Sequence, residues 1–248
     1  MYTDEMAALA EEAASLMLDE KDYGKALKLW GKLYDELDTL HPLPSFDKAE
    51  IALRIAMCQG RLGNHEDAIE IARDQVEYMA EFTGDDWDQV QEALLVLTQV
   101  AGEGGHDDVA IEASARALEA LKDMQAETSP EVALRTALKS EWLALKRGKP
   151  GLGCAGCDVV FQFLTREEKK LKRSRKEASR DDSLREITFL KAQLHESRAR
   201  LYRAANDLEK ARQDLVEAIK HYESARGKGH EAADDARKAL EEIRKLQG

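Results

Sequence analysis

Cys154 and Cys157 are the residues of this chain whose type and spacing most directly suggest chemistry. Two thiols separated by two residues can close a redox-active disulfide or supply half of a tetrahedral zinc site. The third cysteine, Cys58, is distant in the sequence, and none of the six histidines lies next to the pair. Three interpretations remain: small residues at a glycine-rich helix start, regulatory thiols, or metal ligands. We expect the first, and hence no metal and no cofactor.

The basic run Arg166–Lys176 is a second distinctive stretch, with seven basic and two acidic residues. Such a run can bind nucleic acid, an acidic protein segment or an anionic membrane, act as a nuclear address, or form a solvated helix face or linker. Nucleic acid is not favoured, because no aromatic residue is interleaved to stack on a base and the chain has a net charge of −12. The candidates for docking an acidic partner are Lys169, Lys170, Lys172 and Arg173.

Charge is divided unevenly along the chain. Residues 1–150 carry 15 Lys and Arg against 31 Asp and Glu, a net charge of −16. Residues 151–248 carry 22 Lys and Arg against 18 Asp and Glu, a net charge of +4. An acidic partner is therefore expected to approach the C-terminal part of the chain rather than the N-terminal part.

The elements that position these residues are predicted to be helices arranged in repeats. Ala26, Ala68 and Ala110 follow one another at intervals of 42 residues, and each lies in the first turn of an amphipathic stretch. Each stretch follows another apolar-periodic segment after a short turn, which predicts an antiparallel helical hairpin. A later copy of the pattern has its small residue at Ala211. The composition, with 35% charged residues and only 4 prolines, agrees with an all-α chain.

This pattern resembles the tetratricopeptide repeat, in which an aromatic residue and an alanine follow a turn at set offsets. Tyr23 and Ala26 match that step, and Leu208 and Ala211 match it with an aliphatic residue. The 42-residue period exceeds the usual repeat of about 34 residues and is similar to that of kinesin-light-chain-type repeats. The resemblance implies an all-α, right-handed superhelix of antiparallel helical hairpins (an α-solenoid). The polar last helix is the expected C-terminal cap.

We expect residues 1–248 to form a single repeat domain. Its expected parts are repeats at about 5–40, 47–83, 87–125, 130–165 (atypical) and 183–226, a charged insertion at about 166–182 and a cap at 229–247. The register fails between 148 and 181, where the period predicts a small residue but the chain has Leu152. We interpret this region as an atypical second helix followed by the insertion, a common place for functional elaboration in repeat proteins.

The first helices of such a stack line its concave face, so their outward-facing residues are candidates for binding a partner. The register places eight residues there: Arg54, Met57, Arg61, Leu95, Gln99, Glu141, Arg200 and Arg203. The alternative is that these side chains are solvated or paired with neighbouring glutamates. The carboxylate clamp of chaperone-binding family members is not expected, because Glu11 and Ser15 occupy the matching positions of the first repeat.

The sequence favours a non-catalytic scaffold that binds a peptide or helix of a partner protein in the concave groove. The alternative is a structural subunit of a larger assembly, docked through residues 148–181. No nucleophile with a base, phosphate-binding loop or ligand cluster indicates an enzyme or a small-molecule substrate. No stretch approaches the roughly 18 apolar residues that cross a bilayer. The acidic N-terminus and the few cysteines favour the cytoplasm.

Overall fold

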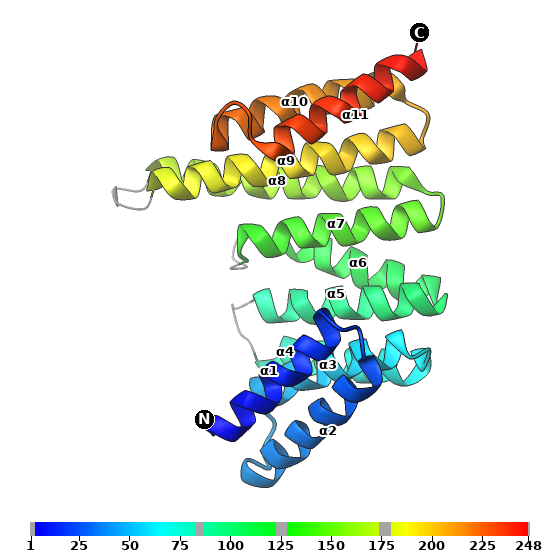
Figure 1. The fold of residues 1–248 in the computed structure, drawn as a ribbon, viewed down its shortest axis with the longest axis vertical. Coiled ribbons are helices and arrows are strands. Elements are labelled where there is room, and N and C mark those ends of the chain that lie inside the picture. The colour runs from blue at the N-terminus through cyan, green and yellow to red at the C-terminus, as the bar shows by residue number, and fades with distance from the viewer. Residues whose placement is uncertain (1–2, 83–86, 123–127, 174–179, 248) are drawn as a thin grey trace. The chain divides into compact units, whose positions relative to one another are not determined.

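The computed structural model describes residues 3–82, 87–122, 128–173 and 180–247. Within these ranges it contains eleven α-helices and no β-strand (Figure 1). None of the helices in these ranges is long and apolar enough to cross a lipid bilayer. The chain divides into two compact units, Met1–Ala117 and Leu118–Gly248, and each has a hydrophobic core of its own.

The first unit is a series of helical hairpins. Its helices are α1 (Asp4–Leu18), α2 (Tyr23–Leu40), α3 (Phe46–Arg61), α4 (His65–Phe82), α5 (Trp87–Gly104) and most of α6 (Asp107–Ala120). Thr3, Asp22 and Ser45 cap the first three helices, because each side chain accepts a hydrogen bond from the backbone N–H three residues later. Packing of α1 on α2, α2 on α3, α3 on α4 and α4 on α5 produces the consecutive antiparallel order that short turns dictate.

Small residues lie where the helices of the first unit approach most closely. Ala26, Ala68 and Ala110 are completely buried. Gly60 of α3 is equally constrained, because a Cβ at this position would lie 3.1 Å from a methyl group of Val100 on α5. The small side chains therefore permit the close helix contacts that the repeat pattern predicts.

The second unit contains two longer hairpins and a final helix. Its helices are α7 (Pro130–Lys146), α8 (Pro150–Arg173), α9 (Arg180–Ala204), α10 (Leu208–Arg226) and α11 (Glu231–Gln247). α7 pairs with α8 and α9 pairs with α10, while α8 also packs on α9 and α11 packs on α10 (Figure 1). α11 buries Ala233, Ala236, Leu240 and Ile243 and exposes a polar opposite side, as expected of a capping helix.

The small residues of α8 that make close contacts lie one and four residues after the predicted position. Leu152, at the position where the period predicts a small residue, is 52% exposed. The close approaches occur instead at Gly153, whose Cβ would lie 2.6 Å from Leu201, and at Gly156, whose Cβ would lie 2.8 Å from Ser140 Oγ. Because α8 packs against α7 and α9 at the same time, it needs small residues on two sides rather than at one repeat position.

The basic run does not follow the helix as an insertion, because residues 166–173 belong to α8 itself, which is 24 residues long. Leu171 packs against the core of the second unit, and the basic residues of the last turn interact favourably with the helix dipole. Asp181 and Asp182 lie in the first turn of α9. Residues 174–176 of the predicted basic run lie outside the described residues.

Candidate functional site

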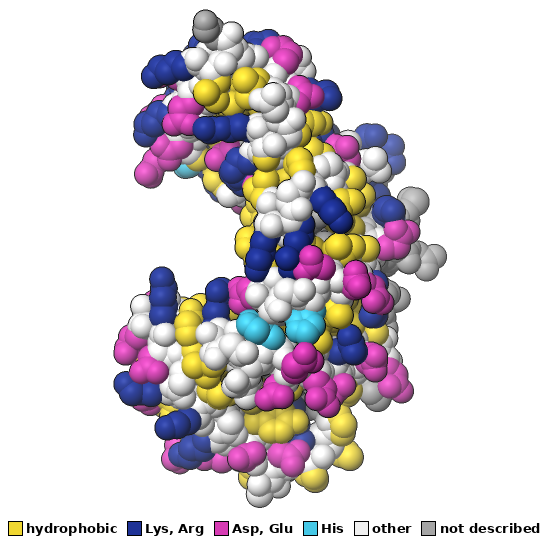
Figure 2. All heavy atoms as spheres, turned by 90° about the vertical axis from the view of Figure 1, so that its right-hand side faces the viewer, with side chains coloured by type: hydrophobic (Ala, Val, Ile, Leu, Met, Phe, Trp, Pro, Cys, Tyr) yellow, Lys and Arg dark blue, Asp and Glu magenta, His cyan; other side chains and the backbone are white. Residues whose placement is uncertain are grey.

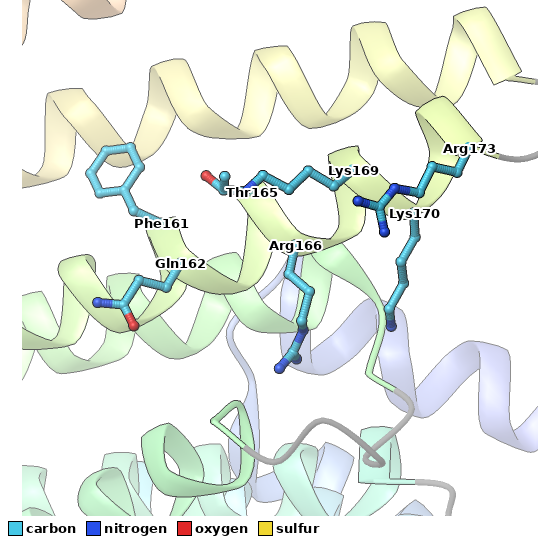
Figure 3. A pocket seen from close by; sticks show the side chains of 7 residues that line it. All are labelled: Phe161, Gln162, Thr165, Arg166, Lys169, Lys170 and Arg173. Carbon is cyan, nitrogen blue, oxygen red and sulfur yellow. The ribbon is translucent and has the colours of Figure 1, made fainter.

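One face of α8 lines an open depression with a volume of about 570 Å³ (Figure 3). Its residues form two rows at four-residue steps, Phe161, Thr165, Lys169 and Arg173 in the first and Gln162, Arg166 and Lys170 in the second. Residues four apart lie on the same side of a helix, so the two rows run next to each other. We call these seven residues the α8 face. Its polar side chains can all donate hydrogen bonds, four are cationic, and the described lining includes no carboxylate.

The cations of the α8 face differ in how far neighbouring groups neutralise them. Lys170 forms an ion pair with Glu167 at 2.8 Å. Arg166 lies 3.7 Å from the same Glu167 carboxylate and donates a hydrogen bond to the backbone carbonyl of Leu121 at 3.3 Å. Lys169 and Arg173 are exposed, and neither has an ion-pair partner within the described part of the chain. Two full positive charges at positions four residues apart are therefore available to an anion.

Lys172, the fourth predicted docking residue, lies outside the depression and is already engaged. Glu168 binds both Lys172 and Lys191 of α9, the latter at 2.5 Å. Hydrogen bonds from these two lysines hold the pKa of Glu168 below its ordinary value. The contact joins the C-terminal part of α8 to α9, so Lys172 serves the helix pair rather than the α8 face.

A polar cluster between α8, α9 and α10 lies next to the Phe161 end of the α8 face. Asp214 is 5% exposed and accepts hydrogen bonds from Nε and Nη2 of Arg198, both at 2.8 Å. His195 Nδ1 lies 2.8 Å from the same carboxylate. Burial would raise the pKa of Asp214, but the hydrogen bonds from Arg198 and His195 outweigh burial and hold that pKa below its ordinary value. Nη1 of Arg198 also contacts Asp158 of α8 at 2.6 Å.

This cluster fixes the ring of Phe161. The ring centroid lies 4.5 Å from that of His195, and the Arg198 guanidinium lies 4.6 Å from the same ring in a cation–π contact. His195 stacks on His221 with centroids 5.4 Å apart. Burial and the neighbouring His195 hold the pKa of His221 below its ordinary value. Phe161 therefore presents a positioned apolar edge at one end of the α8 face.

Glu141 and Arg200, two predicted groove residues, bind each other. Glu141 is 5% exposed, and its carboxylate accepts hydrogen bonds from Arg200 Nε at 2.5 Å and Nη2 at 2.9 Å. The hydroxyl of Ser197 donates to the same carboxylate at 2.5 Å. Arg200 also contacts Glu196, which accepts a hydrogen bond from the hydroxyl of Tyr222. These residues connect α7, α9 and α10, and their polar groups are satisfied within the unit.

The other predicted groove residues also have intramolecular contacts. Arg54 pairs with Glu50 at 3.3 Å, Arg61 with Glu103 at 3.0 Å, Arg203 with Glu242 at 3.1 Å, and Gln99 donates to Glu103 at 3.1 Å. Leu95 is 6% exposed, and Met57 packs against the core of the first unit. Acidic and basic side chains are interspersed on the face shown in Figure 2.

The three cysteines are free thiols in environments that suppress reactivity. Burial raises the pKa of Cys157 to about 12 and that of Cys58 to about 11, and it also raises the pKa of Cys154. Cys157 Sγ lies 3.7 Å from Ser197 Oγ. Among the described residues, no group of three or more His, Cys, Asp and Glu side chains is arranged to hold a metal ion. This packing favours the interpretation of Cys154 and Cys157 as small residues at a helix start.

Several residues of the α8 face were not recognised from the sequence. From the sequence, Phe161 is interpreted as a core residue, and neither Thr165 nor Gln162 belongs to a pattern that indicates a binding site. The four-residue spacing from Phe161 to Arg173 would have indicated a shared face, once the stretch was known to be one helix. The contacts of Asp214 have no comparable signal, because they join helices that are distant in the sequence.

Solved structures contain a similar arrangement of helices. A Podosopora anserina protein described as a kinesin light chain with nearly identical TPR-like repeats is 14% identical, with a TM-score of 0.58 over 90% of this chain and 97% of that one. Its Q17M variant is also 14% identical, with a TM-score of 0.59 over 89% and 95% of the two chains. No protein-family model and no curated protein matches the sequence. At this identity the likeness shows the fold, and it confirms the predicted all-α solenoid of TPR-like helical hairpins.

Proposed function

We propose that this TPR-like repeat protein is a non-catalytic scaffold that holds an acidic segment of a partner protein on the α8 face. The observation that carries the proposal is the contrast between two sets of cations. Arg54, Arg61 and Arg203 of the first helices each have a carboxylate partner within the chain. Lys169 and Arg173 of the α8 face have no ion-pair partner among the described residues, so an incoming anion need not displace one.

The packing of α8 between two other helices also favours the α8 face as the binding surface. Recognition is most specific when the binding side chains stand on a rigid element. α8 packs on both α7 and α9, its residues Phe163 and Leu164 are buried, and Phe161 is held by His195 and Arg198. A partner segment would therefore meet a helix and a Phe161 ring that are already positioned, and binding would have to order only the exposed side chains such as Lys169 and Arg173.

The charge of the whole chain adds selectivity. With a net charge of −12, the molecule repels acidic segments at most of its surface. A basic face on an acidic protein therefore favours one docking position over the others. The predicted groove of the first helices is the less favoured site, because its cations are paired. Docking of a larger assembly through residues 148–181 would use the same α8 face, so this alternative differs from the proposal in the size of the partner.

The test is binding of a fluorescein-labelled, glutamate-rich peptide of about 15 residues, measured by fluorescence anisotropy at low and at physiological salt. The variant K169Q/R173Q removes the two unpaired cations. The matched control is R244Q/K245Q, which changes the net charge equally at two exposed residues of α11. We expect the control to bind as the wild type does and K169Q/R173Q to bind at least about fivefold more weakly. Equal affinity of the two variants would contradict the proposal.

A further inference from the structure

We infer that the α8 face recognises a phosphorylated segment, with the phosphoryl group on Lys169 and Arg173 and an apolar side chain of the same segment on Phe161. The inference rests on the function proposed above and specifies the chemistry of the partner. It follows from three properties of the α8 face: the number of unpaired charges, the type of donors around them, and the distance to Phe161.

The charge count favours a phosphoryl group over a single carboxylate. Glu167 lies within ion-pair distance of both Lys170 and Arg166, so the cations of the α8 face without an ion-pair partner among the described residues are Lys169 and Arg173. A phosphoserine or phosphothreonine carries about −1.5 to −2 charges at neutral pH and three strong acceptor oxygens. One phosphoryl group therefore matches both cations, whereas one carboxylate would leave one of them unmatched.

The donors around these two cations suit the same ligand. Arginine binds phosphate through two parallel N–H groups, and lysine supplies a compact positive charge. Thr165 lies one turn before Lys169 in the same row, and its hydroxyl can donate to a third phosphoryl oxygen. Figure 3 shows Thr165, Lys169 and Arg173 in line along α8. These side chains line the open depression of about 570 Å³, which leaves room for a phosphoryl group beside them.

The position of Phe161 sets the spacing within the partner segment. Phe161 and Lys169 are two four-residue steps apart on the same row, which corresponds to about 12 Å along the helix axis at a rise of 1.5 Å per residue. An extended peptide covers this distance in three to four residues, at about 3.3–3.6 Å each. The preferred segment therefore has an apolar residue three or four positions from the phosphorylated residue.

A peptide array of Gly-Ser background tests both parts of the inference. Each peptide carries a central serine, glutamate or phosphoserine and a leucine one to six positions to either side, and its affinity for the full-length protein is measured by fluorescence anisotropy. We expect phosphoserine peptides to bind at least about tenfold more tightly than the serine peptides, and more tightly than the glutamate peptides. The tightest binding is expected for leucine at three or four positions.

Three variants separate the contributions. K169Q/R173Q should remove the preference for phosphoserine, F161A should remove only the preference for the leucine position, and R244Q/K245Q should retain both. K169Q/R173Q changes exposed residues, and far-ultraviolet circular dichroism verifies that each variant remains folded. If F161A does not fold, F161L is used, and it should weaken the leucine preference.

The outcomes distinguish this inference from the proposed function. Equal binding of glutamate and phosphoserine peptides, both weakened by K169Q/R173Q, would overturn the phosphoryl inference and leave the acidic scaffold standing. Binding that K169Q/R173Q does not affect would overturn both. A single-stranded oligothymidylate that binds the α8 face where no phosphoserine peptide does would identify a nucleic-acid site and would also overturn both.

Discussion

The carboxylate of Asp214 binds two side chains of α9, those of Arg198 and His195. Removing its charge leaves Arg198 without its buried partner, and a buried ion pair that loses one member is strongly destabilised. We predict that Asp214→Asn lowers the free energy of unfolding by about 2–3 kcal/mol. Asp158→Asn removes an exposed partner of the same arginine and should cost less than about 1 kcal/mol. Urea denaturation of both variants measures the difference, and equal losses would contradict the role assigned to burial.

The effect of Asp214 should depend on pH in a defined direction. Its pKa is lowered in the folded protein, so its charge contributes stability that is fully present above the unfolded value of about 3.9. This contribution is lost as the pH falls below that value and approaches the folded pKa. The stability difference between the wild type and Asp214→Asn should therefore shrink as the pH falls below about 4. A difference that grows as the pH falls from about 4 to about 2 would show that Asp214 is not stabilised as a carboxylate.

The cysteines allow a second prediction for individual residues. Thiolates are the reactive form, and burial raises the pKa of all three thiols. We predict slow labelling by a thiol reagent at pH 7, with Cys154 reacting first because it is less buried than Cys157 and Cys58. Mass spectrometry of the labelled protein identifies the order, and labelling in denaturant supplies the control. Rapid modification of Cys157 in the folded protein would restore the interpretation of regulatory thiols.

Individual contacts of the site were only partly predictable from the sequence. The basic residues of α8 could be recognised as candidates, because composition alone reveals a charged run. Glu141 and Arg200 could be placed on first helices, but their mutual ion pair could not be foreseen because they are 59 residues apart. Whether a charged side chain is free or paired depends on such tertiary neighbours, which a single sequence does not show.

Helix packing separates glycines that are required from glycines that are not. A Cβ on Gly156 of α8 would meet Ser140 Oγ at 2.8 Å, whereas one on Gly31 of α2 would meet no atom within 4 Å. We predict that Gly156→Ala destabilises the protein by about 1–3 kcal/mol through overpacking. Gly31→Ala should stabilise it by about 0.5–1 kcal/mol, because alanine favours a helix interior. Thermal denaturation measures both, and destabilisation by Gly31→Ala would contradict the packing described for α2.

The same glycines explain why α8 was the hardest helix to predict. Residues 150–156 include three glycines and a proline, a composition that locally favours a loop. Packing between α7 and α9 overrides that preference, because only small residues fit on both sides of α8. Helices with regular apolar spacing, such as α4 and α10, lie within the predicted repeats at 47–83 and 183–226. Periodicity thus predicts the helices whose packing repeats along the chain and fails where one helix packs differently.

The charge asymmetry of the whole molecule should appear in binding kinetics. Exposed charges mainly change the association rate and its salt dependence. We predict that neutralising Lys169, Lys170, Lys172 and Arg173 together slows association with an acidic peptide, flattens its salt dependence and changes dissociation less. Stopped-flow fluorescence at several salt concentrations measures these rates.

The control for these rates is Arg54→Ala with Arg61→Ala, which alters the predicted concave groove. These arginines are paired with Glu50 and Glu103, so we expect both rates to remain as in the wild type. Faster dissociation of this variant, together with wild-type association and dissociation rates of the α8 variant, would indicate that the binding site lies on the first helices.

The α8 face is contained within residues 161–173 of one helix. Binding surfaces of helical repeat proteins are commonly extended and assembled from several repeats. Here the polar donors occupy one stripe of a single segment, and two buried residues of α8, Phe163 and Leu164, lie between them in the sequence. The polar donors of such a stripe can be introduced on an exposed helix of another protein by substitution. They can also be exchanged in this protein by a few substitutions, while the repeats that carry α8 remain unaltered.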